Sequence, residues 1–178
     1  MNRIIFRLFY TMIKLHAAIF SLFLLFSPEL IAQTNMNALI ATWKLVSARD
    51  TTDKGEVIEA PYGKNPTGFL TYSADGRMMA IITNDGRKFL SGGADTSPVE
   101  EMAAAFATLI AYAGRYTVEG DKVIHHLDAA WVPNVVNRDL VRFIVKVEEN
   151  RLTLRAAPFT RKGVQIAQEE LVWERIAQ

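Results

Sequence analysis

The feature that most constrains this chain is a recurring pattern of short runs in which apolar and polar residues alternate, each run ended by a turn. Residues 67–73 and 77–83, for example, flank Ala74-Asp75-Gly76. Alternation with a period of two is typical of a strand with one face in a core. Glycine tolerates the positive φ that tight turns require. The pattern therefore predicts β-hairpins.

The same arrangement recurs along the rest of the chain. Further alternating runs are residues 43–48, 112–118, 122–129, 139–147, 151–157 and 168–176, with a weaker short run at 56–60. We predict a mainly β protein, an antiparallel β-barrel of about eight to nine strands, because closure removes the edges that promote aggregation. A barrel of that size either is filled by side chains or holds one small ligand.

One segment has helical periodicity instead. Ser97-Pro98-Val99-Glu100 has the composition of a capping box with proline at the first helical position. Apolar residues then recur at helical spacing on one face, namely Val99, Met102, Phe106, Leu109 and Ile110. We predict a helix over about residues 98–111 that packs against an apolar surface.

The N-terminal 32 residues have the features of a secretory signal peptide. Arg3, Arg7 and Lys14 precede an uncharged stretch, and Ala32 is a small residue that would allow cleavage before Gln33. We therefore divide the chain into a signal peptide, 1–32, and one barrel domain, 33–178.

Two points about this segment stay open. Met12 is an alternative start, because the segment that follows it is a compact signal by itself. An uncleaved membrane anchor is the other interpretation. However, Pro28 and Glu29 interrupt the roughly 20 apolar residues that a spanning helix needs. We expect cleavage, and no stable membrane span after it.

Composition narrows the functional classes. The chain has no cysteine, which excludes disulfides, thiolate nucleophiles and a lipid-modified N-terminal cysteine. Its formal net charge of +1 falls to −1 without residues 1–32, which hold three basic residues and one acidic residue. Nothing in that charge favours a nucleic-acid partner. We expect an exported bacterial protein, periplasmic or secreted.

Strand alternation also predicts which side chains face the barrel interior. The predicted inward sets are Val141, Phe143, Val145 and Val147; Leu152 and Leu154; Leu171 and Trp173; and Val123, His125, Leu127 and Ala129. Three further sets each share one face: Trp43, Leu45 and Ser47; Gly68, Leu70 and Tyr72; and Tyr112, Gly114, Tyr116 and Val118. Any ligand site inside the barrel has to be built from such residues.

His125 is the most interesting of these for chemistry. It is followed by His126, which a regular strand places on the opposite face, so the two cannot bind one metal ion. A hydrogen-bonded core histidine is the favoured interpretation of His125. The alternatives are a group that orients a ligand and an acid–base catalyst. Known nucleophile, zinc and phosphate-loop motifs are absent from the sequence, so we assign no catalytic residue, metal or cofactor.

Other side chains are candidates for contact with a ligand. Together with His125, the candidate set is Tyr72, Tyr112, Tyr116, Trp131, Asn134 and Arg142. The tyrosines either line a cavity or pack the barrel, and packing is favoured. The loop that starts at Trp131 either covers the barrel mouth or merely connects two strands. Arg138 and Arg142 can pair with a ligand carboxylate, but a solvated outer face is the favoured alternative.

Several stretches of this sequence resemble the bacterial lipocalin-like domain family. They are Leu39–Ser47, Pro61–Tyr72, Asp75–Met78, Tyr112–Tyr116, Ile124–His126 and Leu171–Arg175, in order over most of residues 38–176. One departure is Ala41-Thr42-Trp43, where lipocalins usually carry Gly-x-Trp. The resemblance implies a lipocalin-like barrel with a small-molecule cavity, and it implies no substrate. It assigns structural roles to Trp43, Tyr62, Gly63, Asn65, Pro66, Gly68, Trp173 and Arg175.

Three functional hypotheses follow. The first is an exported barrel that binds a small, mostly apolar or amphipathic molecule without turnover. The second is an isomerase- or cyclase-type enzyme that acts on a hydrophobic substrate, with His125 as acid or base and a tyrosine as donor. The third is a filled barrel that binds another envelope protein. Enzymatic activity stays undecided here, with binding favoured, and the oligomeric state is left open.

Overall fold

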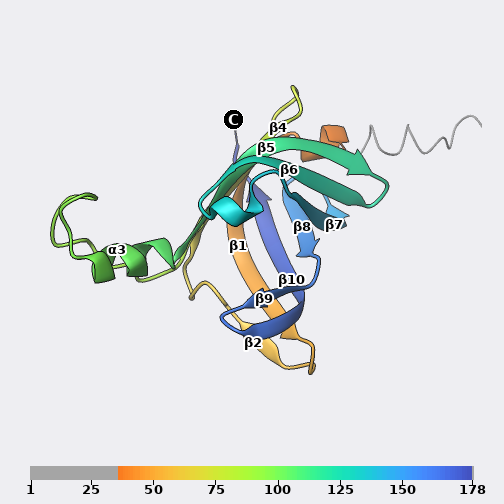
Figure 1. The fold of residues 1–178 in the computed structure, drawn as a ribbon. Coiled ribbons are helices and arrows are strands. Elements are labelled where there is room, and N and C mark those ends of the chain that lie inside the picture. The colour runs from red at the N-terminus through yellow and green to blue at the C-terminus, as the bar shows by residue number, and fades with distance from the viewer. Residues whose placement is uncertain (1–35, 178) are drawn as a thin grey trace, which may run out of the picture.

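The computed structural model describes residues 36–177, and these form a closed antiparallel β-barrel of eight strands with two additional short strands (Figure 1). The strands are β1 Ala41–Thr52, β2 Val57–Glu59, β3 Thr67–Tyr72, β4 Arg77–Thr83, β5 Leu109–Glu119, β6 Lys122–Ala130, β7 Asp139–Val147, β8 Arg151–Ala156, β9 Phe159–Arg161 and β10 Val164–Arg175. The predicted antiparallel barrel is confirmed. The predicted signal peptide, 1–32, lies outside the described residues.

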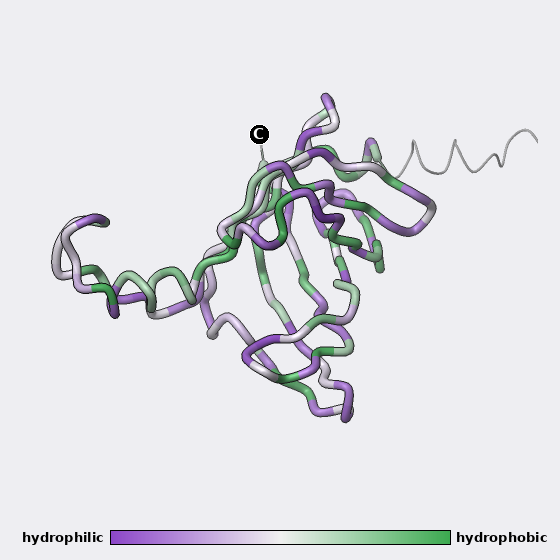
Figure 2. The backbone as a smooth tube through the Cα atoms, viewed as in Figure 1, coloured by the Kyte–Doolittle hydropathy of each residue, from purple (hydrophilic) through white to green (hydrophobic). Residues whose placement is uncertain are grey.

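The barrel closes by pairing its first and last strands. The strand order is β1-β3-β4-β5-β6-β7-β8-β10, and β10 returns to pair with β1, for example at Leu45 and Trp173. Strands β2 and β9 are appended to β1 and β10 respectively. Figure 2 shows hydrophobic and hydrophilic residues interleaved along the barrel strands, as the sequence pattern requires.

Trp43 and Arg175 hold one end of the barrel together. Trp43 is fully buried, and its Nε1 donates to the carbonyl of Leu39 at 2.8 Å. The Arg175 guanidinium lies 4.3 Å from the Trp43 ring centroid. It also donates to the carbonyls of Ala38 and Ile40, at 2.8 and 3.0 Å. This arginine therefore satisfies backbone acceptors and stacks on an aromatic face at once.

The predicted interior sets of β8 and β10 are confirmed, but a bulge changes the face of β1. Leu152, Leu154, Leu171 and Trp173 are all buried. In β1 the register shifts between Leu45 and Ser47. Ser47 is consequently exposed, and the residues that turn inward after the bulge are Ala48 and Asp50.

The prediction for β7 was wrong at two of its four positions. Phe143 carries Lys122 and Arg155 over its ring, at 5.7 and 5.6 Å, on the outer face of the sheet, and Val145 is exposed. The inward residues are Arg142 and Ile144, which pair with the buried Ala156 and Leu154. A register shift between Ile144 and Lys146 then returns Val147 to the core. An unbroken period of two cannot describe a bulged strand. Ala129, also predicted inward, is exposed beyond a register shift in the β5–β6 pair.

The helix prediction was right in existence and wrong in length and packing. Helix α3 covers Val99–Phe106, and none of its residues is buried. Leu109 and Ile110 belong to β5 because they pair with Thr83 and Ile82 of β4. Figure 1 shows α3 on an arm that projects from the barrel.

The predicted capping box does not form. Ser97 Oγ instead accepts from the Gly92 amide at 3.0 Å and donates to the Gly93 carbonyl at 2.9 Å. Ser97 thereby stabilises the preceding loop rather than the first turn of α3. None of the helices within residues 36–177 is both long enough and apolar enough to cross a membrane.

Candidate functional site

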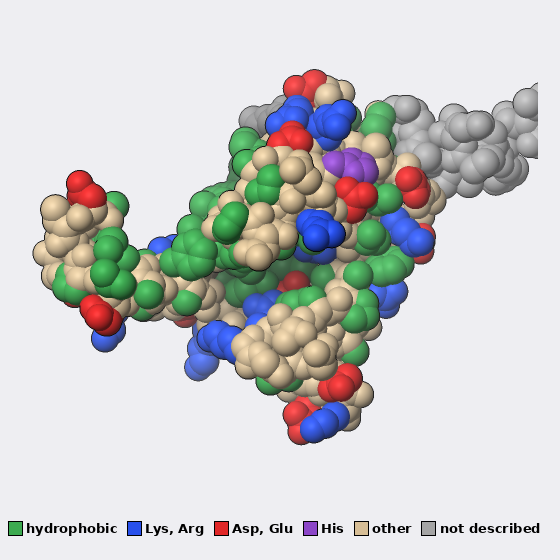
Figure 3. Space-filling model, in the orientation of Figure 1, with side chains coloured by type: hydrophobic (Ala, Val, Ile, Leu, Met, Phe, Trp, Pro, Cys, Tyr) green, Lys and Arg blue, Asp and Glu red, His purple; other side chains and the backbone are tan. Residues whose placement is uncertain are grey.

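A cavity of about 370 Å³ lies within the barrel. Its apolar wall comes from several strands and includes Leu70, Ile82, Leu154, Leu171 and Trp173. Figure 3 shows a hollow on one face of the molecule, with hydrophobic side chains around it and charged side chains in its depth. Volumes of a few hundred Å³ are typical of small-molecule sites. The interior of this barrel is therefore not packed solid.

Polar groups on this cavity wall form a connected line. Tyr72 Oη lies 2.7 Å from His125 Nε2, and Tyr112 Oη lies 3.5 Å from His125 Nδ1. The Arg142 guanidinium in turn interacts with the Tyr112 hydroxyl. The line thus runs from β3 through β6 and β5 to β7. His125, Tyr112 and Arg142 themselves line the cavity.

Burial keeps His125 neutral. Desolvation, together with the positive charge of Arg142, holds the pKa of His125 well below its usual value of 6.5. A neutral imidazole has one donor and one acceptor nitrogen. Tyr72 is almost fully buried, and His125 is its one hydrogen-bond partner among the described residues. Tyr72 therefore donates to Nε2, since its proton has no other acceptor, and the His125 proton sits on Nδ1, facing Tyr112.

Arg142 enters the site from β7. Its Nη1 donates to the carbonyl of Val141 at 3.1 Å. The ion pairs within residues 36–177 do not include Arg142. Its placement in the cavity wall contradicts the solvated outer face that was favoured from strand alternation.

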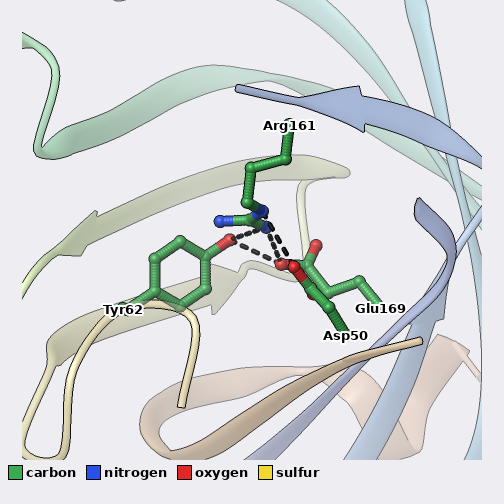
Figure 4. A network of polar contacts seen from close by, with 4 residues as sticks. All are labelled: Asp50, Tyr62, Arg161 and Glu169. Atoms are coloured by element: carbon green, nitrogen blue, oxygen red, sulfur yellow. Dashed lines mark hydrogen bonds and ion pairs between the residues drawn. The ribbon is translucent and has the colours of Figure 1, made fainter. Parts of the chain in front are cut away.

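A second polar cluster is formed by Asp50, Tyr62, Arg161 and Glu169 (Figure 4), and its last three members line the same cavity. Tyr62 Oη donates to Glu169 Oε1 at 2.6 Å and accepts from Arg161 Nη2 at 2.9 Å. Arg161 Nη2 also contacts Glu169 Oε1, and its Nε lies 3.0 Å from Asp50 Oδ2. One arginine therefore holds two buried carboxylates and a phenol.

Ionisation of the acidic groups in this cluster is unfavourable despite their pairing with Arg161. Burial raises the pKa of Asp50 to about 6, against the opposing effect of Arg161 and with a further raise from Glu169. Asp50 Oδ1 accepts no hydrogen bond from any described residue. Burial, reinforced by Glu169, also raises the pKa of Tyr62 above its usual value. The Tyr62 hydroxyl is thus a neutral donor.

Sequence reasoning missed three of these four residues. Asp50 faces inward because a register shift follows Leu45 in β1. Glu169 shares the inward face of Leu171 and Trp173, so alternation could have found it, but a buried carboxylate is rare and was not expected. Arg161 lies on β9, a strand of three residues with no readable alternation. Only Tyr62 was singled out, through the family resemblance, and the structure gives it a buried polar role.

The structure brings together some of the predicted ligand candidates and separates others. Tyr72, Tyr112, His125, Trp131 and Arg142 lie at or directly behind the cavity wall. Tyr116 lies behind them, with its ring centroid 4.8 Å from that of Tyr72 and its hydroxyl donating to the carbonyl of Ser73. Asn134 is exposed on the short 3₁₀ helix η2, Pro133–Val135.

His126 and Arg138 lie elsewhere. His126 is on the outside of the barrel, where Nδ1 lies 2.7 Å from Asp139 Oδ1 and Nε2 lies 2.9 Å from Thr117 Oγ1. Arg138 is exposed. The two adjacent histidines therefore occupy opposite faces, as expected for a strand.

Residues of the Pro61–Tyr72 stretch, which carries part of the family resemblance, make close backbone and side-chain approaches near the cavity. Gly63 adopts a φ of +92°, and a Cβ there would lie 2.5 Å from that of Asp85. A carboxylate oxygen of Asp85 accepts from the Asn65 amide at 3.1 Å. Pro66 is half-buried, and a Cβ at the buried Gly68 would lie 2.8 Å from that of Leu45, so only glycine fits there without a shift.

An apolar groove of about 520 Å³ lies on the outside of the sheet. Phe69, Met79 and Ile81 line it and are exposed, and Trp131 contributes to both the groove and the interior cavity. The groove is larger than the cavity and shares Tyr112 with it, but His125, Arg142 and the other charged groups of the cavity do not line the groove. We therefore take the interior cavity as the candidate site.

Comparison with known families agrees with this architecture. A model of the lipocalin-like domain matches residues 40–176. The chain belongs to the lipocalin-like domain family. The match covers the whole barrel, including every strand that contributes to the cavity. A search of curated proteins found no match.

Solved structures include similar chains of low identity. A crystal structure of a lipocalin-like protein from Bacteroides uniformis is 14% identical, covers 78% of this chain and 99% of its own, and has a TM-score of 0.41. An uncharacterized protein from Bacteroides eggerthii is 11% identical, with coverages of 78% and 99% and a TM-score of 0.40. A redesigned β-barrel is 10% identical, with coverages of 80% and 95% and a TM-score of 0.38. The family assignment rests on the sequence match.

Proposed function

We propose that this lipocalin-like protein binds one small, mostly apolar molecule inside its barrel, without chemical turnover. The observation that carries the proposal is the interior cavity of about 370 Å³, with apolar walls and a short line of polar groups. Such a combination is typical of small-molecule sites, in which apolar surface supplies affinity and few polar groups fix orientation. From the signal-like residues 1–32 we also propose export to the periplasm or medium.

The enzymatic alternative is less well supported. A catalytic His125 would have to exchange a proton with the bound molecule. Its Nε2 is held by Tyr72 at 2.7 Å, and its low pKa makes it a weak base. These contacts favour a histidine that fixes the tyrosines in place over one that turns a substrate over.

Contact with another protein remains a second candidate, because one observation favours it. The outer groove and the α3 arm expose large apolar side chains, including Phe89, Val99 and Phe106. Exposed apolar surface of this kind often marks interaction sites. In this case, a partner protein would bind to the outer groove or the α3 arm and leave the interior cavity uninvolved.

One titration separates the cavity from the groove. The neutral dye N-phenyl-1-naphthylamine, which fluoresces in apolar surroundings, is added to wild-type protein and to two matched Ala→Leu variants. Ala156→Leu fills space in the cavity, whereas Ala129→Leu adds the same volume to the outer groove. We expect saturable one-to-one binding to wild type and Ala129→Leu, and at least tenfold weaker binding to Ala156→Leu. Thermal melts of all three proteins confirm folding. Loss of binding in Ala129→Leu alone would move the site to the groove.

A further inference from the structure

The polar groups of the cavity that lack partners are donors. Tyr112 Oη faces two donors, the Nδ1–H of His125 and the guanidinium of Arg142. Its own proton is therefore free to point into the cavity. Arg142 has five N–H groups and no acceptor, and among the described residues it contacts the Val141 carbonyl and the Tyr112 hydroxyl, which leaves N–H groups for a ligand.

Trp173 adds a further donor. Its side chain is 3% exposed and lines the cavity, yet its Nε1 has no hydrogen-bond partner among the described residues. An indole N–H can only donate. A buried polar group without a partner costs free energy unless something satisfies it. The cavity thus offers N–H and O–H donors to whatever occupies it.

The charged side chains that line the cavity also leave a positive group available to a ligand. Glu169 lines it as well, but its Oε1 is held by Arg161 and Tyr62. Asp139 also lines it, and its Oδ1 pairs with His126 on the outside of the barrel. Arg161 is held by Glu169 and Asp50. Arg142 is therefore the lining charge with no ion-pair partner among the described residues.

From this arrangement we infer that the molecule bound in the barrel is a small organic acid: an apolar body that carries one carboxylate, with the carboxylate against Arg142 and Tyr112. The inference rests on the proposed function and adds the class of ligand. A guanidinium matches the geometry of a carboxylate, and a charge-assisted hydrogen bond is about twice as strong as a neutral one. Tyr72 and His125 then act as positioning residues, because they fix the Tyr112 hydroxyl from behind.

The test uses two probes that differ only in the head group. Octanoate and octan-1-ol compete at pH 8 with bound N-phenyl-1-naphthylamine, on the purified wild-type protein and on Arg142→Gln and Arg138→Gln. Arg138→Gln is the matched control, because it removes an exposed arginine outside the cavity. Thermal melts again confirm folding.

We expect octanoate to displace the dye at a concentration at least about tenfold lower than octan-1-ol does on wild type and on Arg138→Gln. A charged hydrogen bond of about 1.5–3 kcal/mol corresponds to at least that factor. Arg142→Gln should lose this preference and keep its affinity for octan-1-ol within about twofold.

Equal displacement by the two probes on wild-type protein would overturn the acid assignment and leave the proposed function standing. Failure of octanoate to displace a bound dye would also overturn it. If Arg142→Gln still prefers octanoate over octan-1-ol, Arg142 does not bind the carboxylate, and the inferred site is wrong. Absence of dye binding to wild type would instead contradict the proposed function itself. The wild-type comparison decides the inference even if Arg142→Gln does not fold.

Discussion

Tyr72 Oη and His125 Nε2 lie 2.7 Å apart, and the two side chains are 1% exposed each. They come from β3 and β6, which are not neighbours in the sheet, so the hydrogen bond crosses the barrel interior. The pair connects the packed core to the cavity wall through the other imidazole nitrogen. It therefore couples the stability of the barrel to the shape of the site.

Removal of the Tyr72 hydroxyl should destabilise the fold. Tyr72→Phe leaves His125 Nε2 buried without a donor, and we expect a loss of about 1–3 kcal/mol in the free energy of unfolding. Urea denaturation measures it. Tyr116→Phe is the matched control, because its hydroxyl donates to the Ser73 carbonyl nearer the strand end, and it should lose less. Equal losses in the two variants would contradict a special role for the Tyr72–His125 pair.

His125 should make the protein less stable in acid. Its pKa is lowered by folding, so the unfolded chain binds a proton below about pH 6.5 that the folded protein does not. The free energy of unfolding should therefore fall as the pH drops below 6.5, by up to about 1.4 kcal/mol per pH unit from this group. His125→Gln should flatten that slope in urea titrations between pH 8 and 5. An unchanged slope would show that His125 titrates normally.

Asp50 should act in the opposite direction. Its pKa is raised by folding from 3.8 to about 6, so the folded protein binds the extra proton and this group's contribution declines as the pH rises through that window. Asp50→Asn removes the titration. The stability of Asp50→Asn relative to wild type should therefore increase between pH 4 and 7, by at most about 3 kcal/mol. If the stability of Asp50→Asn relative to wild type stays constant or decreases over this pH range, folding does not raise the pKa of Asp50.

The cation of Arg161 should be indispensable to its cluster. Arg161→Met leaves two buried carboxylates without a counterion, which should cost about 3–5 kcal/mol in the free energy of unfolding. Adding Asp50→Asn and Glu169→Gln to the same chain removes both carboxylate charges and should recover most of that loss. Guanidinium chloride denaturation of the single and triple variants measures both steps. A single variant as stable as wild type would show that the cluster does not depend on the ion pairs.

The barrel was predictable because its signals are local. Gly76 and Gly120 both adopt positive φ values in the hairpin turns that the sequence predicted, +80° and +60°. The faces of β8 and β10 near Leu154 and Trp173 also followed simple alternation. The family resemblance also predicted the lipocalin-like barrel, but it identified no ligand and no reaction.

The candidate site was only partly predictable, because its geometry depends on bulges. The tyrosines and His125 lie on regular stretches, so alternation placed them inside. Arg142 was expected on the outer face because residues 141, 143, 145 and 147 are all apolar and were taken as the inward set. The register shift in this strand cannot be recognised from the sequence. Asp50 required the register shift that follows Leu45 in β1. Glu169 follows the regular alternation of β10, and it was missed because a carboxylate is seldom buried. The predicted length of the helix was wrong for another reason: Leu109 and Ile110 pair with β4 and therefore belong to a strand.

The account's central claim is that the interior cavity holds a small molecule. Native mass spectrometry tests it most directly, on protein purified from a bacterial host and then exposed to a lipid and metabolite extract. We predict a one-to-one adduct of a small molecule that is released on collisional activation and is lost in Ala156→Leu but retained in Ala129→Leu. A mass that matches the bare chain before and after exposure, in wild type and variants alike, would contradict the claim.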